Sequence, residues 1–541
     1  MKWQSRSEQK PNLSRMQRQA LSSFHDGDID RTERLCAGIL KYSPSDFDAL
    51  QLLGLLNLQR QRLAEAINFL AAAVKANPIS ADAMSNLGLA LHAAGHYEQA
   101  VASYQNALRV VPDHPEILYN LGNAYLESGR FVDALSSYDG ALKSKPDHVG
   151  ALVNRGNTLL RLNDPLHALA SYDAALVAMP GHPQILTNRG HALRRLDRPA
   201  EALADFNSAR AAAPEFAEAH FEAAMTHLTL GDFDTGWKEY EWRWKTGAFA
   251  RHCRSFRSGL WLGEQAVSGK TILLHAEQGF GDTIQFIRYA PLLARQGARV
   301  VCEVQPELLP LLSQLENVEL VASGAPLPAF DLHCPLLSLP LAFGTRLETI
   351  PSPAGYLDAP GKRREYWRDR LPAGSPRVGF VWSGSSSHKN DGNRSISLAR
   401  LSRPLKELPV AWVSLQTDLR GGDAEILRGL PNLLHLGDDF RDFADTAAVI
   451  SQLDVVVAVD TAVAHLAGAL GKPVIVLLPY AADFRWMRGR DDSPWYSSAK
   501  LLRQPAFGDW DGVVVRLGAE IRSLLDAGPA GHNTARCRVG R

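Results

Sequence analysis

The chain has 541 residues, too many for a single hydrophobic core, so its length predicts several domains. Lysine plus arginine and aspartate plus glutamate both number 58, and a formal net charge of zero gives no electrostatic basis for binding nucleic acid or an anionic membrane surface. The chain shows no apolar run of the roughly 18–20 residues that cross a bilayer and no secretory signal. Its five cysteines form no CxxC pair, so we expect a cytoplasmic protein without a disulfide scaffold or a zinc site.

A period of 34 residues runs through the N-terminal part of the chain. Prolines recur at this spacing at Pro44, Pro78, Pro112, Pro146, Pro180 and Pro214, and glycines recur at Gly54, Gly88, Gly122, Gly156 and Gly190. Small residues allow two helices to pack closely, and each proline ends the second helix of a pair. This pattern resembles the tetratricopeptide repeat, which implies an α-solenoid of about six to seven helical hairpins over residues 13–245. Residues 1–12 are expected to be a disordered tail.

An asparagine recurs at one position of four consecutive repeats, namely Asn86, Asn120, Asn154 and Asn188. Because its side chain carries both a donor and an acceptor, a row of asparagines can hold a peptide backbone without reading its side chains. The other interpretation is that the row bridges neighbouring helices within the array. The architecture is similar to that of O-linked N-acetylglucosamine transferase, in which a matching ladder holds the acceptor, and this implies an acceptor protein or peptide as partner. Homo-oligomerisation through the repeats is a further option.

The last repeat departs from the pattern at Gly236 and continues as WKEYEWRWK. It holds more large aromatic residues than a solvated helix end would, namely Trp237, Tyr240, Trp242 and Trp244. We expect them to be buried against the next domain. Stacking on nucleic acid is the alternative, and the zero net charge argues against it.

Strand and helix patterns alternate over residues 270–360, after a connector at 246–269. Strands are expected at Thr271–His275, Arg299–Val304, Val318–Val321 and Phe330–His333, and a helix at Asp282–Gln296. The chain turns at Gly279-Phe280-Gly281 between the first strand and this helix. Asp282 is therefore expected at a helix N-terminus beside the carboxyl end of a strand, where α/β sheets bind their ligands.

A charged linker at 361–376 leads to a second alternating unit at 377–527, and residues 528–541 are expected to be a disordered tail. We expect the two units to be facing Rossmann-like halves. In the run VVVAVDTAVAHLAGALGKPVIVLL, a buried strand ends at Asp460 and a helix begins at Thr461. The free N–H groups at the start of this helix form an anion site that fits a diphosphate. Ordinary N-capping is the plainer interpretation of this pair.

The loops GFGD (279–282), WSGS (382–385), HKNDGNRS (388–395) and DTAVAHLAGALGKPV (460–474) together resemble glycosyltransferase family 9, the lipopolysaccharide heptosyltransferase family. The resemblance covers about residues 270–515 and implies a GT-B fold that carries out inverting, metal-independent transfer from a nucleotide-sugar donor, without another cofactor. It implies that Asp282 is the general base. Donor contacts are implied for Ser383, Gly384, Lys389 or Arg394, Gln416, Asp460, Thr461, Ala462 and His465. Ala462 stands in place of the family's glycine, and Gln416 in place of an acidic residue.

These features predict a bacterial-type glycosyltransferase, of the hexosyl- or heptosyltransferase class, whose repeats recruit a protein acceptor. One alternative is a non-catalytic scaffold with a degenerate GT-B domain, which Ala462, Gln416 and the short N-terminal half favour. The other is sugar transfer to lipopolysaccharide or another polysaccharide, which would leave the asparagine row without a purpose. We expect the segment Phe484–Trp495, FRWMRGRDDSPW, either to stack on the nucleotide or sugar or to seal the cleft against the array.

Overall fold

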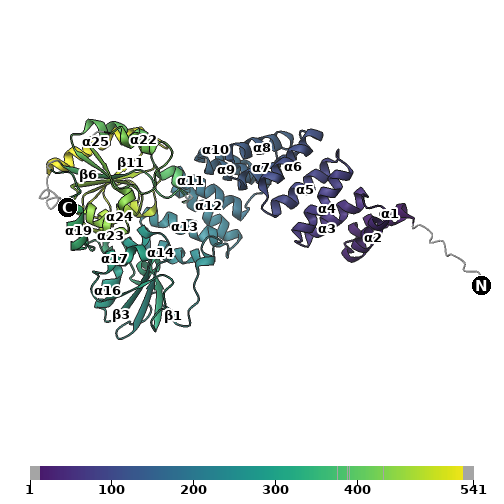
Figure 1. Ribbon diagram of the computed structural model, residues 1–541. Coiled ribbons are helices and arrows are strands. Elements are labelled where there is room, and N and C mark those ends of the chain that lie inside the picture. Colours follow the sequence, from purple (N-terminus) through teal and green to yellow (C-terminus); the bar gives the residue numbers. More distant parts are fainter. Residues whose placement is uncertain (1–11, 374–375, 387, 389, 431, 528–541) are drawn as a thin grey trace, which may run out of the picture. The chain divides into compact units, whose positions relative to one another are not determined.

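A computed structural model describes residues 12–373, 376–386, 388, 390–430 and 432–527 (Figure 1). Nearly all of both tails that we expected to be disordered lie outside the described residues. The chain divides into two compact units, Met1–Ala192 and Leu193–Arg541. The predicted repeat array therefore continues into the second unit, where its last helices belong to the same body as the α/β halves.

The first unit is a stack of helical hairpins, which confirms the predicted α-solenoid (Figure 1). Its helices are α1 (Leu13–His25), α2 (Ile29–Tyr42), α3 (Phe47–Gln59), α4 (Leu63–Ala76), α5 (Ala81–Ala93), α6 (Tyr97–Val110), α7 (Pro115–Glu127), α8 (Phe131–Ser144), α9 (Val149–Arg161), α10 (Pro165–Ala178) and most of α11 (Pro183–Arg195). The repeated glycine is where paired helices meet. A Cβ at Gly122 would lie 2.5 Å from the ring of Tyr138, and one at Gly54 would lie 2.4 Å from Leu70. The packing of these pairs thus requires a residue without a side chain there.

The second unit begins with the last repeat helices, α12 (Pro199–Ala212), α13 (Ala217–Leu230), α14 (Phe233–Tyr240) and the 3-10 turn η1 (Glu241–Lys245). Trp237 and Tyr240 are buried in the core of the first α/β half, which confirms the expected burial for these two. Trp237 packs edge-on against Phe484, with ring centroids 5.7 Å apart. Trp242 instead stacks on His220 of α13, at 3.8 Å, so it stays within the repeat.

The first half contains a parallel sheet of five strands in the order β1-β5-β2-β3-β4. The strands are β1 (Gly259–Leu260), β2 (Thr271–His275), β3 (Arg299–Val304), β4 (Val318–Ala322) and β5 (Leu332–Pro335). Strand β1 lies in the segment expected to be a connector, and β5 begins two residues later than predicted. Alternate residues such as Ile272 and Leu274 share the core with Ile284 and Phe286.

The single helix predicted at Asp282–Gln296 is wrong. The segment forms α15 (Phe280–Phe286), the 3-10 turn η3 (Ile287–Tyr289) and α16 (Ala290–Arg295). Pro291 lies in the first turn of α16 and has no N–H to donate to a preceding carbonyl, so a continuous helix would lose a hydrogen bond there. Shorter helices complete this half: η4 (Pro306–Leu308), α17 (Leu309–Leu312), η5 (Leu336–Ser338), α18 (Leu339–Ala342) and η6 (Leu347–Thr349).

The expected linker is largely a helix, α19 (Gly361–Arg368), which is fastened to the second half. The buried carboxylate of Asp445 accepts hydrogen bonds from Arg363, at 2.8 Å, and from the indole N–H of Trp367, at 3.0 Å. A buried carboxylate is costly without partners, so these bonds hold α19 against α23.

The second half contains a parallel sheet of six strands in the order β11-β10-β9-β6-β7-β8. The strands are β6 (Arg377–Val381), β7 (Ala411–Ser414), β8 (Leu433–His435), β9 (Val455–Val459), β10 (Val474–Leu478) and β11 (Ala499–Arg503). Its helices are α20 (Asp391–Arg394), α21 (Leu398–Glu407), α22 (Asp423–Arg428), η7 (Gly437–Asp439), α23 (Phe443–Ile450), α24 (Ala462–Ala469), η8 (Phe484–Trp486) and α25 (Trp510–Ala527). Both faces of this sheet are covered, because Val456 and Ala458 belong to one core and Val455 and Val457 to another. The predicted fold class, an α-solenoid followed by two Rossmann-type halves, is confirmed.

Candidate active site

The strand order of the second sheet reverses at β6, which lies between β7 and β9. Ligands of open α/β sheets bind at the carboxyl ends of the strands beside such a reversal. Ser383 and Gly384 follow β6 at this position, and Asp460 and Thr461 follow β9. The topology therefore brings two of the predicted donor-binding loops together.

Arg394 joins these two loops. Its Nη1 donates to the backbone carbonyl of Asp460 at 3.0 Å. A Cβ at Gly384 would lie 2.5 Å from the Arg394 guanidinium, so the arginine packs directly on that glycine. Lys389, the other candidate for binding phosphates, lies outside the described residues.

Two buried hydroxyls at this edge have no partner among the described residues. The side chain of Thr461, the N-cap of α24, makes no capping hydrogen bond, and its Oγ1 is buried and unpaired. The Oγ of Ser383, a residue that is 2% exposed, is also unpaired. Buried polar atoms normally find partners, so two such hydroxyls next to the free N–H groups of a helix start indicate a place for a polar ligand.

His465 lies one turn into α24 and is tightly packed. Its ring stacks on Trp486 at 5.3 Å, and its Nδ1 lies 3.0 Å from the hydroxyl of Tyr496. Burial, followed by the charge of Arg485, holds the pKa of His465 well below its ordinary value, so the ring is neutral. Its Nε2 lies 3.8 Å from Asp460 Oδ1.

Burial also acts on Asp460. Together with the nearby carboxylate of Asp483, it raises the pKa of Asp460 to about 6, although Arg394 opposes the shift. This carboxylate thus lies close to a neutral imidazole.

Asp282 occupies the third position of α15, and its carboxylate caps the N-terminus of the helix. The N–H of Gly279 donates to Asp282 Oδ2 at 2.8 Å, and Arg485 forms an ion pair with Oδ1. Arg485 also donates to Asp483 and to Gln285, both at 2.8 Å. Burial alone would lower the pKa of Arg485, but the carboxylates of Asp483 and Asp282 outweigh it and raise the pKa, so the guanidinium stays charged.

The N-termini of α15 and α24 meet at Gly281. A Cβ at this glycine would lie 2.8 Å from His465 Cδ2 and 3.5 Å from Ala462 Cα. The predicted base, from the first half, and the predicted donor residues, from the second half, thus lie side by side. Ala462, which departs from the family's glycine, lies at this contact between the helices.

Gln416 is a second departure from the family pattern, and all its polar atoms are occupied. Its Oε1 accepts from the backbone N–H groups of Trp382 and Ser383 at 3.2 and 3.1 Å. Its Nε2 donates to the carbonyls of Ser383 and Asp418, both at 3.2 Å. A carboxylate could not donate to those carbonyls, so the amide shapes the loop that carries Ser383.

The asparagine row in the first unit contacts a second set of asparagines, which includes Asn123 and Asn157 and was not predicted from the sequence. Asn154 donates to Asn123 Oδ1 of the preceding repeat at 2.8 Å, and Asn188 donates to Asn157 in the same way at 3.2 Å. The bridging interpretation thus applies to these two residues. Asn86 and Asn120 are partly exposed, like the rest of the row.

Three arginines important for the site were not singled out from the sequence: Arg243, Arg288 and Arg485. Arg288 donates to the carbonyls of Trp495 and Pro351, at 2.7 and 2.9 Å, and so ties the first half to the segment after β10. Arg485 lies in the segment 484–495, which we expected to face the nucleotide or the array. Arg488, in the same segment, pairs with Asp197 in the loop between α11 and α12, so this segment contacts the repeats.

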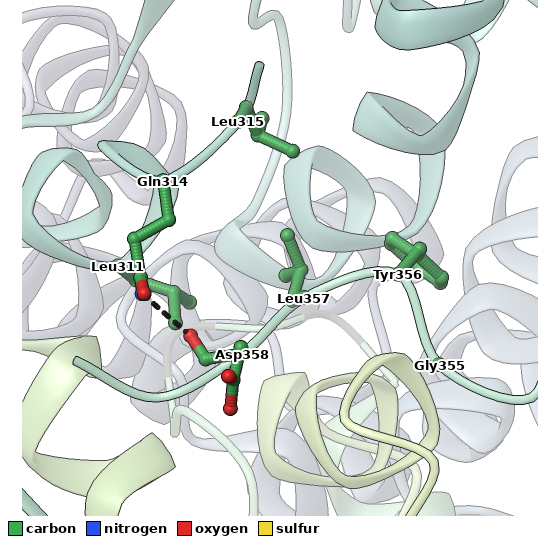
Figure 2. A pocket seen from close by; sticks show the side chains of 7 residues that line it. All are labelled: Leu311, Gln314, Leu315, Gly355, Tyr356, Leu357 and Asp358. Atoms are coloured by element: carbon green, nitrogen blue, oxygen red, sulfur yellow. Dashed lines mark hydrogen bonds between the residues drawn. The ribbon is translucent and has the colours of Figure 1, made fainter. Parts of the chain in front are cut away.

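Figure 2 shows a small pocket beside Tyr356. The hydroxyl of Tyr356 accepts from Arg288 Nη2 at 3.0 Å. It is lined by Leu311, Gln314, Leu315, Gly355, Tyr356, Leu357 and Asp358, and Gln314 donates to the carbonyl of Asp358 at 2.9 Å. A Cβ at Gly355 would lie 3.3 Å from Leu470, the residue that follows α24. The pocket is therefore at the opposite end of α24 from Thr461.

Two family models match the chain. The tetratricopeptide repeat model matches residues 19–81, 85–148, 119–184 and 187–236. The model of glycosyltransferase family 9 (heptosyltransferase) matches residues 441–505, a segment that includes Asp460, His465 and Arg485. The chain carries tetratricopeptide repeats and a segment that is similar to glycosyltransferase family 9. The second match supports glycosyltransferase activity in the broad sense, and the first supports protein interaction.

Among curated proteins, the chain is similar to protein FlbA of Caulobacter vibrioides, with 24% identity over 339 residues. The match covers 57% of this chain and 56% of FlbA, so the chain spans only about half the length of this relative. Within the described residues, no helix combines the length and the apolar character needed to cross a membrane.

Solved structures of repeat proteins also match. MamA is 18% identical, with a TM-score of 0.29, over 30% of this chain and 90% of its own. YrrB, whose structure is described as that of a TPR protein with an unusual peptide-binding site, is 20% identical, with a TM-score of 0.31, over 34% of this chain and 95% of its own. A tetratricopeptide repeat protein from Parabacteroides merdae is 16% identical, with a TM-score of 0.36, over 42% and 91%.

Proposed function

We propose that this chain is an inverting, metal-independent glycosyltransferase that moves a sugar from a nucleotide-sugar donor to a protein acceptor recruited by its repeats. The observation that carries the proposal is the meeting of two loops that lie far apart in the sequence. Asp282 at the start of α15 is joined to Arg485, and Gly281 lies against His465 at the start of α24. A carboxylate and an anion-binding helix start are the two groups that this chemistry needs in one place.

The donor side is the edge of the second sheet. A diphosphate leaving group needs N–H donors and positive charge, which the start of α24 and Arg394 can supply. The unpaired hydroxyls of Ser383 and Thr461 would gain partners when phosphate oxygens arrive. Binding would thus satisfy two buried hydroxyls that have no partner in the part of the chain that the structure describes.

The acceptor side is Asp282. Each carboxylate oxygen has two lone pairs and, among the described residues, one partner, so a lone pair remains on each oxygen to take a proton from an acceptor hydroxyl. Gly279 and Arg485 hold the carboxylate in one orientation, which keeps it in place for that step.

The test uses the full-length protein, a panel of nucleotide sugars and acceptor proteins that co-purify with it, with transfer read by intact-protein mass spectrometry. Asp282→Asn should lower the transfer rate by about 100- to 10,000-fold and leave nucleotide affinity unchanged, because asparagine can still accept from the Gly279 N–H or from Arg485 but cannot take a proton from the acceptor. The matched control is Asp511→Asn, at a carboxylate whose side chain is 79% exposed, which should transfer like wild type. Transfer by Asp282→Asn at the wild-type rate would refute the assignment of the base.

A non-catalytic scaffold is the second candidate, and one observation favours it. Both oxygens of Asp282 are already engaged, and its side chain is only 20% exposed. A scaffold would keep this ion pair for stability alone. It predicts that no nucleotide sugar binds, and that Asp282→Asn retains full biological function.

A further inference from the structure

Arg243 comes from the last repeat, yet it lies inside the first α/β half. It belongs to the turn η1, and its side chain is 0% exposed. Its guanidinium lies over the rings of Tyr240 and Trp244, at 4.6 and 4.4 Å from the ring centroids. A fully buried arginine is stable only where its charge and its donors find partners.

Those partners lie on the loops that follow two neighbouring strands. Nη2 of Arg243 donates to both carboxylate oxygens of Glu277, at 3.2 Å each, and to Ser338 Oγ at 2.7 Å. Glu277 follows β2 and Ser338 lies in η5 after β5. Strands β2 and β5 are adjacent, and the strand order of the first sheet reverses between them. Arg243 therefore joins the two loops at the carboxyl edge where such a sheet holds its functional groups.

The loop that Arg243 holds leads directly to Asp282. Gln278, the residue after Glu277, donates to the hydroxyl of Tyr240 at 3.1 Å, and Gly279 donates to Asp282 Oδ2 at 2.8 Å. Consecutive residues thus connect the last repeat to the carboxylate through three anchored positions. Small displacements of a reacting group cost large factors in rate, so the position of this loop matters for catalysis.

One guanidinium faces two carboxylates at this contact. Glu241 also accepts from Arg243, at 2.7 Å, and its side chain is 17% exposed, whereas that of Glu277 is 2% exposed. Burial raises the pKa of Glu277 to about 7, and Arg243 limits the shift. Without the guanidinium, two carboxylates would face each other in a buried site, and Glu277 would take up a proton.

We propose that Arg243, acting through Glu277 and the loop 277–279, is a positioning residue for Asp282, so that the last tetratricopeptide repeat is part of the catalytic domain. This inference rests on the proposed function for its catalytic consequence. Its structural part, the anchoring of the loop, can be measured without any acceptor.

The decisive variant is Arg243→Lys, because an ammonium keeps the charge but cannot span Glu277, Glu241 and Ser338 at once. In the full chain, kcat should fall about 10- to 100-fold, with nucleotide affinity within about twofold of wild type. Lys245→Met is the matched control, since Lys245 lies in the same turn and pairs with Glu215 at 3.2 Å with its side chain 58% exposed. It should transfer like wild type. If Arg243→Lys fails to fold, Glu277→Gln takes its place, with the same loss of kcat expected.

A double-mutant cycle separates positioning from a general loss of structure. In the Asp282→Asn background, Arg243→Lys should change the residual rate by less than about threefold, because the group that it positions is gone. An equal fold-loss in both backgrounds, or a kcat within about twofold of wild type for Arg243→Lys or its Glu277→Gln substitute, would overturn the inference.

Hydrogen exchange followed by mass spectrometry tests the anchoring itself. Arg243→Lys should speed exchange of backbone amides in residues 276–286 and leave residues 455–470 unchanged, whereas Lys245→Met should alter neither. If Arg243→Lys speeds exchange at 276–286 but the wild-type protein transfers no sugar, the anchoring is supported and the proposed function is refuted. Unchanged exchange at 276–286 would overturn the inference even if the wild type is an active transferase.

Discussion

Replacing Gly281 by alanine adds one methyl group at the contact between α15 and α24. The new Cβ would lie 2.8 Å from His465 Cδ2, which is closer than the ordinary contact distance of about 3.5–4 Å between carbon atoms. His465 cannot easily move away, because Trp486 stacks on its ring and Tyr496 lies against its Nδ1. The two helix starts must therefore separate by a fraction of an ångström or more.

Two opposing terms set the magnitude for Gly281→Ala. Overpacking of a rigid contact costs about 1–3 kcal/mol, whereas alanine in place of glycine in a helix returns about 0.5–1 kcal/mol. Because the neighbour is a wedged ring rather than a flexible chain end, we expect a net loss of about 1–2 kcal/mol. That corresponds to a fall in Tm of about 2–5 °C. Nucleotide affinity should fall about 3- to 10-fold, since the start of α24 is displaced.

Differential scanning fluorimetry and calorimetric titration measure the two effects. The matched control is Gly361→Ala at the first residue of α19, where a new Cβ would meet no atom within 4 Å, so Tm and affinity should stay the same or rise slightly. If Gly281→Ala matches wild type in both Tm and affinity, the close approach of α15 and α24 is not a feature of the folded protein.

Three further predictions concern stability. Arg485→Met leaves Asp282 and Asp483 without their shared cation, so it should lower the free energy of unfolding, measured in urea, by about 2–4 kcal/mol. Arg485→Lys should lower it less. A methionine variant as stable as wild type would contradict the ion pair. The pKa of Glu277 is raised by burial to about 7, so the folded state binds its proton more tightly, and its contribution to the free energy of unfolding should fall as pH rises from about 4.5 to 7. We therefore expect the free energy of unfolding of wild type minus that of Glu277→Gln to be up to about 3 kcal/mol larger at pH 5 than at pH 8. The same difference at both pH values would refute this. Asn154→Ala should destabilise the first unit by about 0.5–1.5 kcal/mol, because it removes the hydrogen bond to Asn123. Asn120 makes no side-chain hydrogen bond among the described residues, so Asn120→Ala should destabilise it less. Equal losses would contradict a stabilising role for the Asn154–Asn123 bond.

The strands and the repeats were predictable because their signals are local. Residues 271–275 and 299–304 are short apolar runs, and both strands begin and end as the sequence predicts. The repeat period predicted the helical hairpins, because Gly54, Gly88, Gly122 and Gly156 each meet a side chain of the partner helix. The loops that carry Asp282 and Asp460 could be placed at strand ends for the same reason.

The partners of these residues could not be predicted, because they come from distant parts of the chain. Nothing near Asp282 in the sequence points to Arg485, and nothing in the repeat pattern marks Arg243 as the partner of Glu277. The role of Gln416 could not be predicted for a related reason. From the sequence, an amide in place of an acid indicates the loss of a donor contact, and only the structure shows its four backbone hydrogen bonds. A two-residue strand such as β1 leaves no periodic signal at all.

The most direct test of the account is calorimetric titration of the full-length protein with nucleoside diphosphates and nucleotide sugars, for wild type and Ser383→Ala. The account predicts that one nucleotide binds wild type, and that Ser383→Ala, which removes a buried unpaired hydroxyl, weakens binding about tenfold without lowering Tm. Equal binding by both proteins, or no binding by any nucleotide to the folded wild type, would contradict a donor site at the ends of β6 and β9.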